Sequence, residues 1–145
     1  MKLHHPFLWL ILIQNAPVVV PWTTALLEQP ASLATRMKEK TAGPVVIQVG
    51  FETLYRSNHI SKSEYAGPAS TAQGLESLRK RLSSVPRDAD LVLYCGCCPF
   101  DKCPNTKPAF TLAKEMGFSK VKVLLIEKNL NDDWISKGYP TETHH

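Results

Sequence analysis

Short apolar runs alternate along this chain with segments of helical periodicity, and this alternation leaves few folds open to it. The runs are rich in Val, Ile and Leu, and they are predicted to form buried strands over residues 45–49, 91–94 and 121–126. Between the first two runs, Leu75, Leu78 and Leu82 recur at helical spacing. Strands separated by helices form β-α-β units. The predicted fold class is therefore α/β: three layers, with a central, mainly parallel sheet and helices on both faces.

Glycine and proline mark the expected ends of the helices. The first helix is predicted from about Gln29 to Gly43, and Pro104 is expected in the first turn of a helix that Gly117 ends. Trp134 is expected to anchor a last short helix. A chain of 145 residues suits one domain with a real core. We therefore predict a single domain over residues 29–142.

The amino terminus has the form of a secretory signal. A positively charged start is followed by the apolar residues 7–13, far fewer than the ~20 that a membrane span requires. Small residues at 23–25 suit a signal peptidase, so residues 1–25 are predicted to be a signal peptide. We expect export to the periplasm or another extracytoplasmic space, where disulfides persist. The alternative is a cytoplasmic protein with this segment packed on the domain as a strand or arm.

The charge pattern bears on the possible partners. The formal net charge is +4, and the Lys and Arg residues are scattered among acidic neighbours. Nucleic-acid binding normally needs a clustered basic surface, so we expect no nucleic-acid partner. We also expect no stable membrane span and a monomer.

All four cysteines lie in one short segment directly after the run at 91–94: Cys95, Cys97, Cys98 and Cys103. In parallel sheets, ligands bind beyond the carboxyl ends of the strands, where Cys95 is predicted to lie. Backbone N–H groups and the start of the following helix favour an anion there, so we expect the pKa of the Cys95 thiol to be lowered. Gly96 lets the backbone turn without a side-chain clash. Cys95 is thus predicted to be a nucleophile.

The order of these segments resembles a rhodanese domain. The second half of a rhodanese domain is similar to the segment that begins with the strand at 91–94. This segment continues with Cys95, a helix and the next strand, and it ends with residues 134–140 (WISKGYP). Residues 45–49 and 58–60 (NHI) resemble its first half, where the family usually has a strand ending in Asp-Val-Arg and then Gly-His-Ile. The resemblance covers about residues 29–142.

This resemblance implies a sulfurtransferase or persulfide carrier, with Cys95 as the catalytic cysteine. Its thiolate attacks the outer sulfur of a donor, holds that sulfur as a persulfide and passes it to an acceptor. The implied partners are a small sulfur donor and a thiol or persulfide acceptor, such as a protein thiol. The resemblance implies no metal and no organic cofactor.

Several positions depart from the family's form. The loop is longer and has no arginine, whose place falls near Asn105. Residues 48–50 read Gln-Val-Gly, and the paired glycines before the last helix are replaced near Asn129. A lysine cannot present the bidentate fork of arginine to thiosulfate, so we expect exchange with thiols and persulfides instead.

The substrate-binding loop is predicted to begin at Gly96 and to form an anion cradle as far as Asn105. Its predicted members are Gly96, Cys97, Cys98, Phe100, Asp101, Lys102, Cys103, Asn105 and Lys107. Arg56 and His59 are auxiliary candidates, Arg56 because the loop lacks an arginine of its own. Arg56 would supply the missing anion-binding charge.

The three additional cysteines leave alternatives open. One of them could resolve a persulfide or sulfenic acid on Cys95 as a disulfide. If a bridge forms within the loop, we expect Cys97 or Cys98 to pair with Cys103. The spacing C-x-C-C-x-x-x-x-C could also hold Cu(I) or Zn(II), which would make the domain a metal-binding module. A third possibility is a catalytically inert rhodanese-like binding domain.

Overall fold

A five-stranded parallel sheet forms the centre of the computed structural model, which describes residues 22–39 and 43–143. Its strands are β1 (Leu27–Glu28), β2 (Val45–Gln48), β4 (Glu64–Tyr65), β5 (Leu91–Tyr94) and β6 (Val121–Leu124). They lie in the order β1-β6-β5-β2-β4, and every neighbouring pair is parallel. A separate antiparallel pair joins β3 (His59–Ile60) to β7 (Thr141–Glu142). The predicted strand at 91–94 is the central strand of the large sheet.

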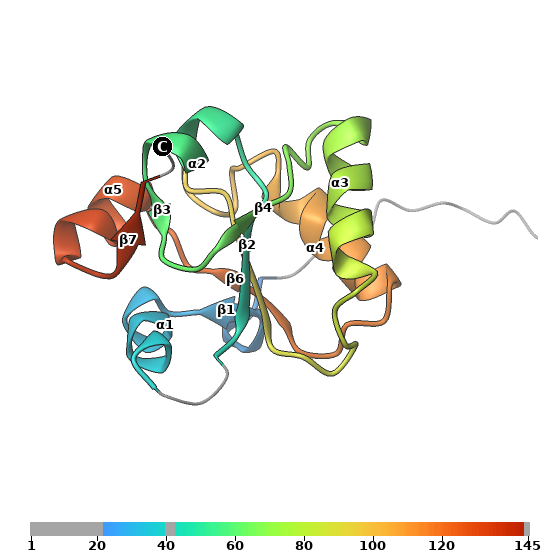
Figure 1. Ribbon diagram of the computed structural model, residues 1–145, viewed down its shortest axis with the longest axis horizontal. Coiled ribbons are helices and arrows are strands. Elements are labelled where there is room, and N and C mark those ends of the chain that lie inside the picture. The colour runs from blue at the N-terminus through green and yellow to red at the C-terminus, as the bar shows by residue number, and fades with distance from the viewer. Residues whose placement is uncertain (1–21, 40–42, 144–145) are drawn as a thin grey trace, which may run out of the picture.

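Helices cover both faces of this sheet (Figure 1). They are α1 (Pro30–Met37), α2 (Glu52–Ser57), α3 (Ala72–Leu82), α4 (Thr106–Glu115) and α5 (Leu130–Asp133), with short 3-10 turns at Thr24–Leu26 and Ile135–Lys137. Successive strand residues point to opposite faces: Leu93 packs with the core under α3 and α4, and Val92 packs with the core under α1 and α5. The predicted α/β class with helices on both faces is confirmed.

The ends of the helices agree with the predictions only in part: α1 ends at Met37, with Lys38 as its C-cap, earlier than the predicted end near Gly43. Gly117 follows α4 with φ of +92°, and Gly138 ends the last turn with φ of +73°, a backbone conformation that favours glycine. Pro104 does not lie in the first turn of α4, because Asn105 is the N-cap and the helix begins at Thr106. The loop therefore extends one residue beyond Pro104, to Asn105, whose side chain is held by the Ser70 backbone N–H. The proline in the first turn is Pro108.

The described part of the domain begins before residue 29. The Trp22 ring lies edge-on against Phe100 and Phe110, with ring centroids 5.7 and 5.2 Å away, and β1 pairs with β6. Most of the predicted signal peptide, residues 1–21, lies outside the described residues, and it stays a prediction. Within 22–39 and 43–143, no helix has the length and apolar character needed to span a bilayer.

Candidate active site

Cys95 lies directly after β5, at the carboxyl edge of the sheet, and its side chain is buried. The neighbouring strand β2 holds this position, since the Gln48 amide donates a hydrogen bond of 3.1 Å to the Cys95 carbonyl. Gly50 provides room: a Cβ atom there would lie only 2.6 Å from the Cys95 sulfur. The next residue, Gly96, has φ of +85° and turns the chain into the loop. Glycines at 50 and 96 thus allow the cysteine to pack against the end of β2.

The four thiols gather in one cluster. The Cys97 sulfur lies 3.3 Å from that of Cys95, 3.8 Å from that of Cys103 and 2.8 Å from that of Cys98. All four cysteines are free thiols, so the disulfide considered between Cys103 and Cys97 or Cys98 is not formed in this structure. A disulfide requires sulfur atoms about 2.05 Å apart.

Asn105 supplies amide donors to this cluster from the N-cap of α4. Its side chain is fully buried, and its Oδ1 accepts a 2.8 Å hydrogen bond from the Ser70 backbone N–H. That bond fixes which way the amide points. The NH₂ group therefore faces the sulfurs, 3.5 Å from Cys95 and 3.8 Å from Cys103. A neutral donor thus occupies the place where the resemblance puts an arginine.

The surroundings act in opposite directions on two thiols of the cluster: they lower the pKa of Cys103 and raise that of Cys95. Interaction with the Cys95 thiol, together with the backbone N–H of Asn105, lowers the pKa of Cys103 to about 4. The same interaction with Cys103, and burial, raise the pKa of Cys95. Burial and the neighbouring sulfurs raise the pKa of Cys98 to about 12. The expectation that the loop lowers the pKa of Cys95 is therefore wrong, because the interaction with Cys103 and the burial of the sulfur both disfavour the Cys95 thiolate.

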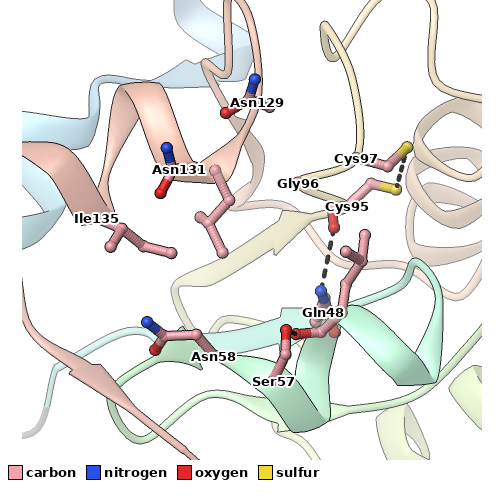
Figure 2. Close-up of a pocket in the computed structure, with 11 residues that line it drawn as sticks. Gln48, Ser57, Asn58, Cys95, Gly96, Cys97, Asn129, Asn131 and Ile135 are labelled. Atoms are coloured by element: carbon pink, nitrogen blue, oxygen red, sulfur yellow. Dashed lines mark hydrogen bonds between the residues drawn. The ribbon is translucent and has the colours of Figure 1, made fainter.

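A cavity of about 540 Å³ opens beside Cys95. Amide and hydroxyl groups line it from several segments, together with apolar side chains that include Leu130 and Ile135; the polar members are Gln48, Ser57, Asn58, Asn129 and Asn131. Two of the amide oxygens, Gln48 Oε1 and Asn58 Oδ1, are buried without a hydrogen-bond partner. Figure 2 shows the Cys95 and Cys97 sulfurs pointing away from Asn129 and Asn131, toward the loop. Among residues 22–39 and 43–143, no charged side chain lines this cavity.

Comparison with known proteins identifies the fold. The sequence matches no family model and no curated protein. Among solved structures, the rhodanese-like domain of the Alr3790 protein of Anabaena sp. is 20% identical, with a TM-score of 0.60, covering 81% of this chain and 79% of its own. The BH2092 protein of Bacillus halodurans is 18% identical, with a TM-score of 0.64, and the match covers 82% of this chain and 77% of BH2092. A single-domain sulfurtransferase of Saccharomyces cerevisiae is 14% identical, with a TM-score of 0.56, and the match covers 81% of this chain and 95% of the yeast protein.

The chain has the rhodanese-like fold. At these identities the likeness concerns the architecture, and the chemistry has to be argued from the residues of this chain. The Cys-rich loop lies at the carboxyl edge of the rhodanese-like sheet, directly after its central strand.

Three departures from the rhodanese motifs lie in the same cavity. Gln48 replaces the usual Asp at the end of β2, Asn58 replaces the Gly before His59, and Asn129 lies where paired glycines are usual; all three line it. In the sequence, Gln48 and Asn129 stand out as departures from the family pattern and Asn58 belongs to the segment that resembles it, and no cavity joining the three was predicted. At all three positions an amide side chain stands where the family usually has a small or a charged residue. This wall of the site is therefore polar and neutral.

The two auxiliary candidates do not reach the cysteine cluster. Arg56 is exposed and its guanidinium binds Glu52 on the same helix, with a shortest distance of 3.1 Å. His59 is buried, stacks on Tyr55 and donates from Nδ1 to the Tyr55 carbonyl at 2.8 Å. Neither side chain lines the cavity.

The remaining loop candidates divide by burial. Asp101, Lys102 and Lys107 are exposed, and Phe100 is half-buried against Trp22. The Phe100 backbone N–H donates a 2.9 Å hydrogen bond to the Ile126 carbonyl, and the Gly96 carbonyl accepts one of 2.9 Å from the Leu130 N–H, so the start and the middle of the loop are anchored. Of the predicted loop residues, the structure brings Cys97, Cys98, Cys103 and Asn105 together around Cys95.

Proposed function

We propose that this protein is a sulfurtransferase or persulfide carrier in which Cys95 accepts the transferred sulfur. The observation that carries this proposal is the position of the Cys95 sulfur. It lies at the carboxyl edge of the central strand, 3.3 Å from a second thiol and 3.5 Å from the Asn105 amide. The rhodanese-like fold supports it, and one solved structure with this architecture is titled a sulfurtransferase.

The chemistry consists of two displacements at sulfur. Cys95 Sγ attacks the outer sulfur of a donor persulfide, a new S–S bond forms, and the donor's own S–S bond breaks. The departing thiolate takes up the proton that Cys95 loses, either directly or through Cys103, the thiol of the cluster whose pKa is lowered. In the second step an acceptor thiolate attacks the outer sulfur, and Cys95 leaves as a thiolate. The Asn105 amide, directed at this sulfur, stabilises the negative charge that develops in both steps.

The surroundings favour persulfides over thiosulfate as donors. The cavity beside Cys95 is lined without a charged side chain, and the anchor at residue 105 is a neutral amide. Lys102 and Lys107 are exposed. Burying the charged oxygens of thiosulfate against neutral amides forfeits the ion pairing that would offset their loss of hydration. A thiol or persulfide carries its reactive charge on sulfur alone.

Intact-mass spectrometry tests the proposal directly. Reduced protein is exposed to a low-molecular-weight persulfide or to thiosulfate, and the gain of one sulfur atom per chain is followed with time. We expect the persulfide to label the protein much faster than thiosulfate, and we expect Cys95→Ser to abolish the labelling.

Cys98→Ser is the matched control, because Cys98 contacts Cys97 and is not placed in the transfer steps. It should be labelled like the unmodified protein. Labelling of Cys95→Ser at the original rate would move the chemistry to another cysteine, and a protein that no donor labels would be an inert binding domain.

A further inference from the structure

Three sulfurs of the cluster are spaced like the ligands of a bound metal ion. The Sγ atoms of Cys95, Cys97 and Cys103 all lie within 4.8 Å of one another. Two of the three separations are 3.3 and 3.8 Å. Three thiolates in a plane around an ion, each with a metal–sulfur bond of about 2.3 Å, lie ~4.0 Å apart. The observed separations lie around this value, so only small side-chain movements are needed to hold an ion.

The number and type of donors select the metal. Thiolates are soft ligands that favour Cu(I), whereas a structural Zn(II) site takes four ligands in a tetrahedron. Cys98 is not a member of the three-sulfur set, although its sulfur lies 2.8 Å from that of Cys97. Within the described ranges, no His, Asp or Glu joins the set either. A trigonal set of three sulfurs therefore suits Cu(I) better than Zn(II).

The surroundings of the three sulfurs fit a metal centre. Cys95 and Cys103 are buried, and Cys97 is half-buried and lines the cavity, which leaves a route for an ion. The Asn105 NH₂ group faces both Cys95 and Cys103, and its direction is fixed from behind by Ser70. Hydrogen bonds of this kind orient thiolate ligands and offset part of their negative charge.

We propose that Cys95, Cys97 and Cys103 form a three-coordinate thiolate site for Cu(I). The three sulfurs bind as thiolates, so any thiol proton still present is released to the solvent as the ion enters, and no electron is transferred. The site goes beyond the proposed sulfur transfer. Because it uses the Cys95 sulfur, the copper-loaded protein should not accept sulfur.

The test is an anaerobic titration of the reduced, metal-free protein with Cu(I), in competition with the chelator bathocuproine disulfonate. We expect one Cu(I) per chain to be retained, and X-ray absorption to show three sulfur neighbours at about 2.3 Å. Replacing a ligand should weaken binding at least as much as the loss of a supporting hydrogen bond, so Cys97→Ser should lose about 100-fold or more in affinity. Asn105→Leu should lose about 10-fold.

Cys98→Ser is the matched control and should keep both the stoichiometry and the affinity. Cys103→Ser provides a second ligand variant, and circular dichroism checks that each variant is folded. Three results would overturn the proposal: loss of all copper to the chelator, equal affinity for Cys97→Ser, or a four-sulfur shell that Cys98→Ser disrupts. Sulfur labelling is measured separately on metal-free protein, so either proposal can fail while the other stands.

Discussion

The cysteine loop, residues 95–105, and the α2–β3 segment, residues 52–60, were both expected from the sequence to contribute to the site. In the loop, the reactive groups lie close together: two thiols, Cys97 and Cys103, and the Asn105 amide surround the Cys95 sulfur. In the α2–β3 segment, Arg56 and His59 are each bound to a residue four positions earlier, Glu52 and Tyr55. The side chains of the loop lie against other reactive groups and are therefore available for chemistry. Arg56 and His59 instead use their polar atoms to bind neighbouring residues, which gives them a structural role.

The two regions also differ in what holds them. The loop depends on residues distant in sequence: Gln48 binds the Cys95 carbonyl, and Ser70 binds Asn105. Gly50 allows the close approach of the Cys95 sulfur. Arg56 contacts Glu52 within its own helix, and His59 contacts Tyr55 four positions earlier and also Glu142 of β7, whose carboxylate lies 3.7 Å from His59 Nε2. Substitutions remote in sequence should therefore disrupt the loop, whereas the chemistry should tolerate the loss of the Arg56 or the His59 side chain.

The largest effect is expected for Gly50→Ala. The new Cβ would lie 2.6 Å from the Cys95 sulfur and 2.9 Å from the Cys95 carbonyl oxygen, so the loop or β2 must move. We expect overpacking to lower the free energy of unfolding by about 3 kcal/mol, with loss of sulfur labelling at Cys95. Urea unfolding and intact-mass spectrometry measure the two effects.

Gly43→Ala is the control for this substitution, since a Cβ there has its nearest neighbour at 4.0 Å. It should leave both the stability and the labelling close to those of the original protein. Equal stability of the two variants would show that the end of β2 does not constrain Cys95.

A smaller effect is expected for Asn105→Leu. Leucine removes the amide that faces Cys95 and Cys103 and leaves the Ser70 N–H without its acceptor. We expect a loss of about 1–3 kcal/mol in the free energy of unfolding, from urea titration, and slower sulfur labelling. Asn131→Leu, an exposed amide in the same cavity, should change stability by less than about 0.5 kcal/mol. Unchanged labelling in Asn105→Leu would contradict a role for this amide in the site.

His59→Phe tests the other region and should have a modest effect on stability alone. Phenylalanine keeps a ring against Tyr55 but loses the hydrogen bond to the Tyr55 carbonyl. We expect a loss of about 1 kcal/mol in the free energy of unfolding and no change in the rate of sulfur labelling. A slower rate in a folded variant would place His59 in the chemistry after all.

The sequence predicted the centre of the fold better than its edges. The strand at 91–94 has the predicted bounds, because a parallel strand buried on both faces appears in the sequence as a continuous apolar run. The strands β1, β3, β4 and β7 are two residues long, too short to show any periodicity. Their positions depend on pairing with distant segments.

The sequence predicted the cysteine loop of the site, but it did not predict the charges within the loop or the cavity beside it. Four cysteines in one loop indicated sulfur chemistry at Cys95, but which thiol carries the charge depends on which sulfur meets the N–H groups at the start of α4. The cavity was missed because Asn58 and Asn129, far apart in the chain, meet only in the folded domain. Contacts of this kind leave no local pattern in a sequence.

The smallest effect is expected for Arg56→Ala, and this variant tests the comparison most sharply. Arg56 and Glu52 are both exposed, so their ion pair should contribute less than about 0.5 kcal/mol to the free energy of unfolding. Because Arg56 does not line the cavity beside Cys95, the ratio of labelling rates with thiosulfate and with a persulfide should stay unchanged.

Removing any surface arginine weakens the long-range attraction of an anionic donor, so a control with the same charge change is needed. Arg79→Ala provides it: Arg79 is also exposed and paired with a glutamate of its own helix, on α3. If both variants slow thiosulfate labelling equally, the effect is the net charge. If only Arg56→Ala does so, Arg56 reaches the anion during the reaction, and its side chain contributes to the site despite its local ion pair.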